Sequence, residues 1–277
     1  MRIGLSTPVV VQLPGHRSDW EERATVEDLA RVAAVADALG LDHLTCSEHV
    51  AVPVETAATR GATYWDPLAT LSFLAARTTR IRLATSVLVL GYHHPLALAK
   101  RYGTLDRLSG GRVVLGVGVG SLEQEFALLD AAWDDRGRRA DDTLRSLRAA
   151  WGRPEVDGLV IEPHATSTHV PVWVGGRTAR SLRRAVELGN GWMPFGLPSD
   201  ELGALLARVE LPPDFEVVLG PGRPLDPLGD PDRARRRLIA LRDVGATVAS
   251  CAVRADSADH CCDQLGALRD LADEIGD

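Results

Sequence analysis

One feature of this 277-residue chain limits its possible folds more than any other: short apolar segments alternate regularly with longer segments of helical periodicity. Eight apolar segments have the length of β-strands, and hydrophobic residues recur every three to four positions in the segments between them. The expected strands are Ile3–Ser6, His43–Ser47, Ile81–Leu88, Arg112–Val117, Val172–Val174, Gly191–Phe195, Glu216–Leu219 and Thr247–Val253. Strands this apolar have to be buried on both faces, as they are in a parallel sheet that closes into a barrel. We therefore predict an α/β protein with a (β/α)8 TIM-barrel fold.

The segments between the strands carry residues that favour helix ends. Gly40 follows the helix expected at Val26–Leu39, and a proline opens each of the helices expected at Pro67–Arg77 and Pro95–Leu108. Further helices are expected at Leu122–Leu129, Arg138–Trp151, Ala179–Leu188, Glu201–Val209, Asp232–Val244 and Ala258–Ile275. A barrel of this kind uses about 250 residues as one unit, and no break in composition marks a linker. Residues 1–277 are therefore expected to form a single domain.

Charge and composition narrow the class of protein. The formal net charge is −7, and no long basic run supplies the stripe that binding to a nucleic-acid backbone requires. Lys100 is the only lysine, and the other 30 of the 31 basic residues are arginines, which is consistent with a GC-rich, actinobacterial genome. Met1–Trp20 contain one short apolar run, so we expect neither a signal peptide nor a membrane span. The four cysteines lack C-x-x-C spacing, which predicts a cytoplasmic protein with reduced thiols and no metal site.

Residues that could take part in catalysis or ligand binding follow several of the expected strands. The working face of a β/α barrel lies at the carboxyl ends of its strands. Glu48 and His49 follow the second strand, and a histidine there can exchange a proton near neutral pH. Gly118, Gly120 and Ser121 follow the fourth strand, where the glycines leave room for a ligand to approach the backbone. The glycines here are spaced G-x-G-x-G, so they do not match the dinucleotide-binding fingerprint G-x-G-x-x-G, whose third glycine is missing.

A second group of residues follows the fifth strand. Gly175, Gly176, Arg177 and Thr178 place two glycines, a guanidinium and a hydroxyl just before a helix. The free N–H groups at the start of a helix attract phosphate, so this step predicts a phosphate-binding turn. An ordinary tight turn between strand and helix would use the same residues, and both interpretations stay open.

Four stretches of the chain carry a resemblance to a known family. They are the run from Arg80 to Gly120, which contains L-A-T-S-V-L-V-L-G-Y-H-H-P, the segment D-D-R-G-R-R-A-D-D-T-L-R-S-L-R-A-A-W at Asp134–Trp151, the segment P-V-W-V-G-G at Pro171–Gly176, and the segment L-G-N-G-W-M-P at Leu188–Pro194. They resemble the luciferase-like family of flavin and deazaflavin oxidoreductases, and within it the chain is most similar to the branch that uses coenzyme F420. The resemblance implies hydride transfer between F420 and a small organic substrate.

The resemblance also implies roles for individual residues. Glu48 and His49 would lie beside the deazaflavin ring, although members of this branch usually have aspartate at the position of Glu48. Thr85, Ser86 and Val87 would support the rear face of the ring, often through a non-proline cis peptide bond.

The remaining implied contacts are to the rest of the cofactor. Its side chain would lie against Gly118 and Gly120, and its phosphate would meet Gly175 and Gly176. Ser121 departs from the pattern, because some members carry a glutamate there as a proton donor. The nearest acids in this chain are Glu123 and Glu125, so the proton donor is not identified, and the departure argues against the sugar-phosphate dehydrogenase members.

The segment Val50–Trp65 is longer than the two to six residues that usually join a strand to a helix in such barrels. We expect it to cover the substrate, with Tyr64 or Trp65 lining the pocket. The resemblance further implies a homodimer, with the helix at Pro95–Leu108 as a possible contact surface.

Two alternatives stay open. The chain could be an FMN-dependent monooxygenase that activates oxygen with reduced flavin from a partner reductase, since both cofactors present a tricyclic ring and a phosphate. It could also be a noncatalytic paralogue that binds flavin, an interpretation that Ser121 favours and that Glu48, His49, Gly175 and Gly176 disfavour. The residues do not identify the substrate or the direction of hydride transfer.

Overall fold

A closed barrel of eight parallel strands forms the centre of the computed structural model, which describes residues 1–276. The barrel strands are β1 (Arg2–Leu5), β3 (His43–Cys46), β5 (Arg82–Thr85), β7 (Val113–Gly118), β10 (Val172–Gly175), β11 (Gly191–Met193), β12 (Glu216–Leu219) and β13 (Val248–Cys251). They pair in this order, and the pairing of β13 with β1 closes the ring. The predicted TIM-barrel fold is confirmed.

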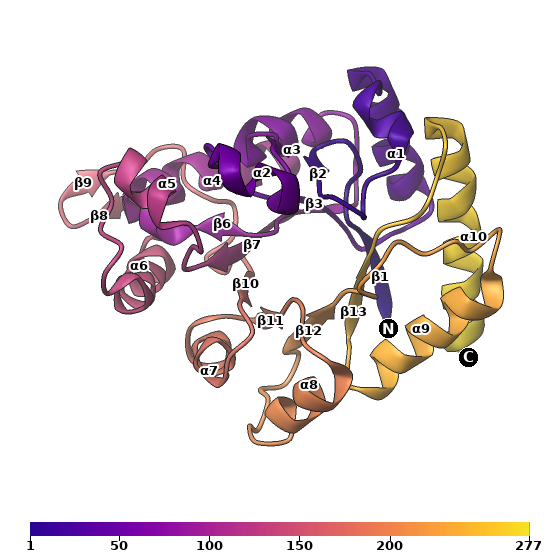
Figure 1. The fold of residues 1–277 in the computed structure, drawn as a ribbon. Coiled ribbons are helices and arrows are strands. Elements are labelled where there is room, and N and C mark those ends of the chain that lie inside the picture. The colour runs from indigo at the N-terminus through magenta and orange to yellow at the C-terminus, as the bar shows by residue number, and fades with distance from the viewer. Residues whose placement is uncertain (277) are drawn as a thin grey trace.

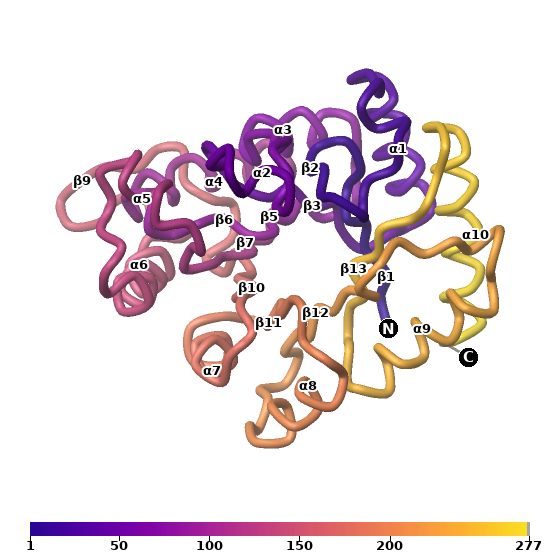
Figure 2. The backbone as a smooth tube through the Cα atoms, viewed as in Figure 1, coloured from indigo at the N-terminus to yellow at the C-terminus, as the bar shows by residue number. Residues whose placement is uncertain are grey.

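Helices surround the barrel on the outside (Figure 1). They are α1 (Val26–Ala38), α3 (Pro67–Ala75), α4 (Pro95–Ser109), α5 (Glu123–Leu128), α6 (Arg136–Ala150), α7 (Ala179–Leu188), α8 (Ser199–Leu206), α9 (Pro231–Asp243) and α10 (Ala258–Gly276). The two ends of the chain lie side by side, as the indigo and yellow parts of the tube in Figure 2 show, because β1 pairs with β13 and α1 packs on α10. In the described part of the chain, no helix is long and apolar enough to cross a membrane.

Smaller elements lie in the loops. The strand β2 (Val11–Gln12) pairs with β4 (Thr63–Tyr64), β6 (Leu88–Val89) pairs in parallel with β7, and β8 (Glu155–Val156) forms a hairpin with β9 (Leu159–Val160). The loops also contain the helix α2 (Val54–Arg60) and the 3-10 turns η1 (Asp19–Glu22) and η2 (Leu90–Tyr92).

The expected third strand, Ile81–Leu88, needs a correction. It is divided into β5 and β6, because a cis peptide bond between Ser86 and Val87 interrupts the extended backbone. The segment expected only as a long loop at Val50–Trp65 also contains structure of its own, namely α2 and β4. Short elements of this kind depend on contacts with distant residues, which local periodicity does not report.

Two apolar clusters hold the barrel together. The larger one lies between the strands and the surrounding helices and includes Leu29, Leu71 and Leu144, which are fully buried. The smaller one fills the interior of the barrel with one residue from each of six strands: Ala84, Val114, Trp173, Met193, Val218 and Val248. The interior of the barrel is therefore a packed core and not a channel.

A network of charges closes the amino-terminal end of the barrel. Asp42 accepts hydrogen bonds from Arg2, Arg82 and the ring of His43, with 2.8 Å between Asp42 Oδ2 and His43 Nδ1. The imidazole of His43 lies where a side chain at position 4 would be, because a Cβ atom added to Gly4 would come within 2.1 Å of the ring. Nε2 of His43 lies 3.1 Å from Ser250 Oγ.

The other acid of this network is Glu216. It accepts hydrogen bonds from Arg2, Arg82 and the indole N–H of Trp173. Two carboxylates therefore face two guanidinium groups, so the charges of these four side chains balance at the end of the barrel that is remote from the carboxyl ends of the strands.

Burial and the charged neighbours have opposite effects on Asp42. Burial raises its pKa, but the hydrogen bond from His43 and the positive charge of Arg82 prevail and hold the pKa at about 2, below the usual 3.8. Burial lowers the pKa of His43, which is fully enclosed, so its ring is neutral. The ionised carboxylate of Asp42 therefore stabilises the fold above pH ~4, and this stabilisation is lost as the pH falls towards 2.

We predict that Asp42→Asn lowers the free energy of unfolding by about 3 kcal/mol at pH 7, because it removes one of the two carboxylates that pair with Arg82 and the charged acceptor of the His43 hydrogen bond. The difference from the wild type should shrink as the pH falls from about 5 to 2, where the wild-type carboxylate becomes protonated. Urea unfolding at pH 7 and pH 3 measures both values. The control is Asp142→Asn, which removes an exposed ion pair with Arg145 and should cost less than about 0.5 kcal/mol. A pH-independent effect of Asp42→Asn would contradict this account.

Candidate functional site

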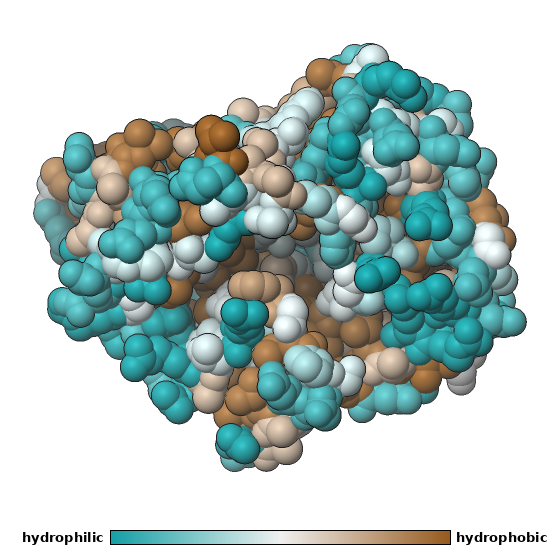
Figure 3. All heavy atoms as spheres, in the orientation of Figure 1, coloured by the Kyte–Doolittle hydropathy of each residue, from teal (hydrophilic) through white to brown (hydrophobic). Residues whose placement is uncertain are grey.

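The candidate residues meet at the carboxyl ends of adjacent strands. Glu48 and His49 follow β3, Ser86 and Val87 follow β5, and Gly118 lies at the end of β7. The residues from Gly175 to Thr178 follow β10, which pairs with β7. Because β3, β5, β7 and β10 are consecutive in the closed sheet, these residues share one half of the barrel mouth. Figure 3 shows a hollow in the middle of the face that it presents, with a largely hydrophilic rim.

Glu48 is a buried anchor for the strand that follows the cis peptide bond. Its carboxylate accepts a hydrogen bond from Val89 N at 2.6 Å and lies 2.7 Å from His93 Nε2. Glu48 is 8% exposed. The structure therefore directs Glu48 towards β6 and His93, away from its sequence neighbour His49, and gives it a role in positioning the backbone beside Val87.

His49 pairs with a different acid. Its Nδ1 atom lies 2.6 Å from Glu125 Oε2, and Tyr92 donates its hydroxyl hydrogen to the same oxygen at 2.9 Å. Glu125 is 1% exposed, although it lies on the short helix α5 at the surface of the barrel. Of the two acids near Ser121, the tertiary structure selects Glu125, while Glu123 is exposed.

The hydrogen bonds determine that Glu125 is ionised and which ring nitrogen of His49 carries a hydrogen. Burial raises the pKa of Glu125, but the hydrogen bonds from His49, Tyr92 and Val50 and the proximity of His49 outweigh it, so the pKa is lowered and the group is ionised at neutral pH. Since a carboxylate only accepts, Nδ1 of His49 carries a hydrogen. A neutral His49 therefore has its free lone pair on Nε2, the tautomer that can accept a proton from a substrate.

Glu125 also holds the start of the segment Val50–Trp65. Its second oxygen accepts hydrogen bonds from Val50 N at 2.7 Å and from Ala51 N at 3.2 Å. The far end of the segment returns to the same place, because the ring of Tyr64 packs edge-on against His49 with 4.5 Å between the centroids. One carboxylate thus orients the histidine and fixes the segment beside it.

The predicted pocket residues of this segment lie in different surroundings. Tyr64 contacts His49 and donates its hydroxyl hydrogen to Arg60 O, and Arg60 in turn donates to Ser121 Oγ at 3.1 Å. Trp65 packs against the hydrophobic core and donates its backbone N–H to Val10 O. Of the two, Tyr64 is the one that the structure brings to the histidine. Ser121 contacts α2 through Arg60.

The glycines of the site make room for protein side chains. A Cβ atom on Gly118 would lie 2.7 Å from Val87 Cγ2, and one on Gly175 would lie 2.9 Å from Val87 Cγ1. A Cβ atom on Gly120 would lie 2.5 Å from the ring of Phe126. Val87 is therefore seated between β7 and β10, next to the cis peptide bond that joins it to Ser86. Thr85, which precedes Ser86, is fixed in place because it donates its hydroxyl hydrogen to Gly116 O at 2.7 Å.

The turn after β10 leads into α7 through a capping box. Thr178 Oγ1 accepts a hydrogen bond from Ser181 N, and Ser181 Oγ accepts one from Thr178 N. Gly176 has a φ angle of +114°, which residues with side chains rarely adopt. Arg177 is exposed and its guanidinium lies over the ring of Phe195, 5.9 Å from the centroid. The turn therefore presents a cation and the start of a helix to the mouth of the barrel.

A cavity of about 250 Å³ lies beside this half of the mouth. Polar side chains from three strand ends face it: Ser6, Thr7, Thr45, Ser47 and Ser86. Ser47 donates its hydroxyl hydrogen to Ser86 O at 2.6 Å, so the carbonyl of the cis peptide bond is held at the cavity wall. Among residues 1–276 no three His, Cys, Asp or Glu side chains converge in a way that suits a metal ion.

The family follows from comparison with known proteins. The family model described as luciferase-like monooxygenase matches residues 1–218. An uncharacterized protein of Mycobacterium tuberculosis is 32% identical over 204 residues, which are 65% of this chain and 72% of that protein. Limonene 1,2-monooxygenase of Rhodococcus erythropolis is 31% identical over 131 residues, or 47% of this chain and 32% of that enzyme. The chain belongs to the luciferase-like monooxygenase family.

Solved structures agree on the fold. The monooxygenase RslO1 of Streptomyces bottropensis covers the whole of both chains with a TM-score of 0.80 and 22% identity. Long-chain alkane monooxygenase (LadA) gives a TM-score of 0.80 with 14% identity over 100% of this chain and 92% of that one. An F420-dependent secondary alcohol dehydrogenase gives 0.64 with 15% identity over 98% and 90%. The neighbours thus include monooxygenases and an F420-dependent enzyme.

Tyr92 and His93 lie in the G-Y-H-H run that follows the expected third strand, and no role in the site is predicted for them from the sequence; the structure shows that they reach Glu125 and Glu48. Glu125 did leave a signal. It lies three positions after Leu122 and one before Phe126, and both of these are buried, so an acid stands on the apolar face of a short helix. A carboxylate in that position needs several donors, and the site supplies them.

We predict that Glu125→Ala speeds hydrogen exchange at the amides of Val50 and Ala51 by about tenfold or more, because each loses a charge-assisted hydrogen bond. Exchange measured by NMR or mass spectrometry tests this. The matched control is Glu123→Ala, which removes an exposed acid from the same helix and should leave both amides unchanged. Equal exchange in the two variants would show that Glu125 does not hold the segment.

Proposed function

We propose that this protein is an oxidoreductase that binds coenzyme F420 at the mouth of the barrel and transfers a hydride between the cofactor and a small organic substrate. The observation that carries the proposal is the His49–Glu125 pair. Its ionised carboxylate fixes an imidazole with a free Nε2 after β3, the strand that pairs with β5, and β5 leads to Ser86 and Val87.

The residues of the mouth fit a ring-and-phosphate cofactor. Ser47 and Ser86 form a wall of the cavity against which a flat ring can lie, and the other polar groups of the cavity suit the edges of the ring. The cationic Arg177 and the amino-terminal N–H groups of the ten-residue helix α7 suit a phosphate. Gly118 and Gly175 contribute indirectly, because they allow Val87 to sit between their strands.

His49 is the residue that would handle the proton of the reaction. Nε2 of His49 would accept the hydroxyl proton of an alcohol substrate during its oxidation and would return that proton to the oxygen atom in the reverse direction. Glu125 stabilises the imidazolium and keeps the ring in one tautomer and orientation, as a buried acid does for other catalytic histidines. The cofactor, when bound, supplies the hydride acceptor or donor.

The segment Val50–Trp65 would exclude water from this step. It is fixed at its start by Glu125, and it pairs through β4 with β2. Tyr92 lies beside Glu125 and keeps its hydroxyl hydrogen, because burial and the hydrogen bond to Glu125 raise its pKa. It therefore acts as a hydrogen-bond donor.

A second candidate function keeps the site and changes the cofactor. An FMN-dependent monooxygenase that receives reduced flavin from a partner reductase is favoured by the names of the relatives, among them a limonene monooxygenase, and by the higher TM-scores of RslO1 and LadA. The two candidates differ in what the protein binds and in whether it consumes oxygen.

A paired titration with F420 and FMN, followed by cofactor fluorescence, tests the proposal. We expect saturable binding of F420 that Gly176→Asp weakens by about tenfold or more relative to Gly176→Asn, because only Asp places a negative charge beside the phosphate. The two substitutions have the same size and the same backbone penalty at φ +114°, so their difference isolates charge. Equal binding by both variants would remove the phosphate from this turn.

His49→Ala serves as the second arm of this titration. We expect it to retain cofactor affinity to within about threefold, because the histidine is assigned to the proton and not to binding. Preference for FMN would favour the monooxygenase, with oxygen consumption as its assay. Binding of neither cofactor would overturn both candidates in favour of a noncatalytic protein.

A further inference from the structure

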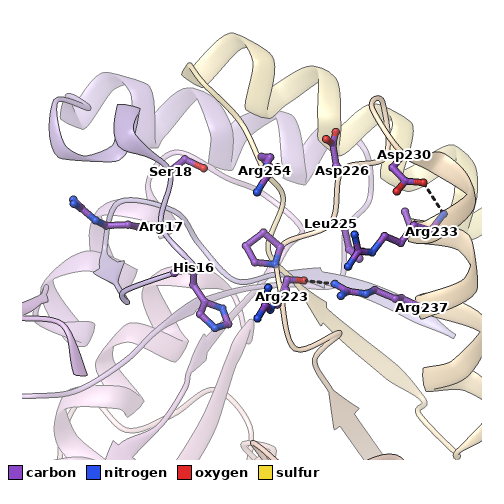
Figure 4. Close-up of a pocket in the computed structure, with 13 residues that line it drawn as sticks. His16, Arg17, Ser18, Arg223, Leu225, Asp226, Asp230, Arg233, Arg237 and Arg254 are labelled. Atoms are coloured by element: carbon purple, nitrogen blue, oxygen red, sulfur yellow. Dashed lines mark hydrogen bonds between the residues drawn. The ribbon is translucent and has the colours of Figure 1, made fainter. Parts of the chain in front are cut away.

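Four arginines outside the site described above converge on a second pocket at the barrel mouth. Arg223 lies in the segment that follows β12, Arg254 follows β13, and Arg233 and Arg237 lie one turn apart on α9. The pocket measures about 240 Å³, and His16 contributes to its wall (Figure 4).

None of these four arginines forms an ion pair in residues 1–276, although the charge of Arg254 helps to lower the pKa of Asp226. In residues 1–276, the ion pairs of α9 involve Arg235 and Arg242, which contact Asp232, Glu274 and Asp243. The four pocket arginines take part in none. The guanidinium of Arg237 donates a hydrogen bond to a backbone oxygen, Arg223 O, at 3.3 Å.

The two carboxylates of the pocket are already engaged. Asp226 accepts hydrogen bonds from Gly229 N at 2.9 Å and from Gln264 Nε2 at 2.7 Å. Asp230 caps α9 by accepting from Arg233 N at 3.1 Å. A third acid, Glu22, pairs with Arg17, whose side chain points away from the pocket in Figure 4. Positive charge therefore exceeds negative charge in this pocket, although the chain as a whole has a net charge of −7.

Composition does not explain this arrangement. An arginine-rich genome decides that the bases are arginines and not lysines, but it does not bring four of them from different segments to one cavity that holds only two acids. Like charges at close range repel one another, whereas a cleft lined by one sign of charge concentrates ligands of the opposite sign. The cluster has a physical reason if an anion binds there.

We propose that this pocket binds the oxyanion group, a phosphate or a carboxylate, of a small-molecule substrate. Guanidinium groups bind both through paired hydrogen bonds. The location agrees with a general property of this architecture, in which the loops after the seventh and eighth strands often bind phosphate. In this chain those strands are β12 and β13.

The pocket continues towards the proposed redox site. It shares His16 and Arg17 with the cavity whose wall contains Ser47 and Ser86. A ligand with its anionic group among the arginines can therefore extend its other end to the cis peptide bond. This orientation of the substrate rests on the proposed function, whereas the anion site itself does not.

Calorimetric titration of the purified protein with inorganic phosphate and with malonate, at constant ionic strength, tests the proposal. We expect saturable binding of at least one of them, weakened about a hundredfold by Arg233→Gln combined with Arg254→Gln, because each removed guanidinium costs about tenfold. The control pair is Arg235→Gln combined with Arg242→Gln, which changes the same net charge outside the pocket and should leave binding unchanged.

Each outcome decides one question. Tighter binding of phosphate identifies a phosphoryl group, and tighter binding of malonate identifies a carboxylate. No binding, or equal loss in the pocket and control variants, overturns the proposal. Cofactor affinity measured on the same variants separates the two inferences: cofactor binding without anion binding overturns this one alone, and anion binding without cofactor binding overturns the proposed function.

Discussion

Closure of the parallel barrel is the constraint on which the rest of the molecule depends. Because every strand runs in the same direction, all eight carboxyl ends open at one mouth, and segments far apart in the sequence meet there. The opposite end is closed by two acids and two arginines, and the interior between them is filled by apolar side chains. The chain thus separates its two tasks: charge pairing and packing stabilise one end, and the polar groups at the other end remain available for chemistry.

A single buried carboxylate organises the proposed redox half of the mouth. Glu125 accepts hydrogen bonds from His49, Tyr92, Val50 and Ala51, so it sets a tautomer and fixes a segment at once. Glu48 does similar work for β6. Ionised carboxylates are costly to bury unless every oxygen is satisfied, and here the partners that satisfy them are the groups that shape the site.

The two halves of the mouth differ in electrostatic character. One half presents buried carboxylates that orient a histidine, and the other presents arginines that follow β12 and β13 or lie on α9 and that form no ion pair in the described residues. A substrate with an apolar reacting end and an anionic group would match this division. The residues of the first half lie within residues 1–218, which the luciferase-like monooxygenase family model matches, whereas the four arginines of the second half lie beyond that match.

The sequence by itself determined the order and type of the barrel elements, since all eight strands and nine flanking helices follow from apolar segments, prolines and glycines that act over a few residues. It also brought out Glu48, His49 and the turn at Gly176. The tertiary structure decided the partners of these residues: Glu48 pairs with His93, and His49 pairs with Glu125. It also placed the side chain of Val87 against Gly118 and Gly175. Local periodicity fixes which face of an element is buried, but the contact of His49 with Glu125 and the shared pocket of Arg223 and Arg254 exist only once the barrel has closed.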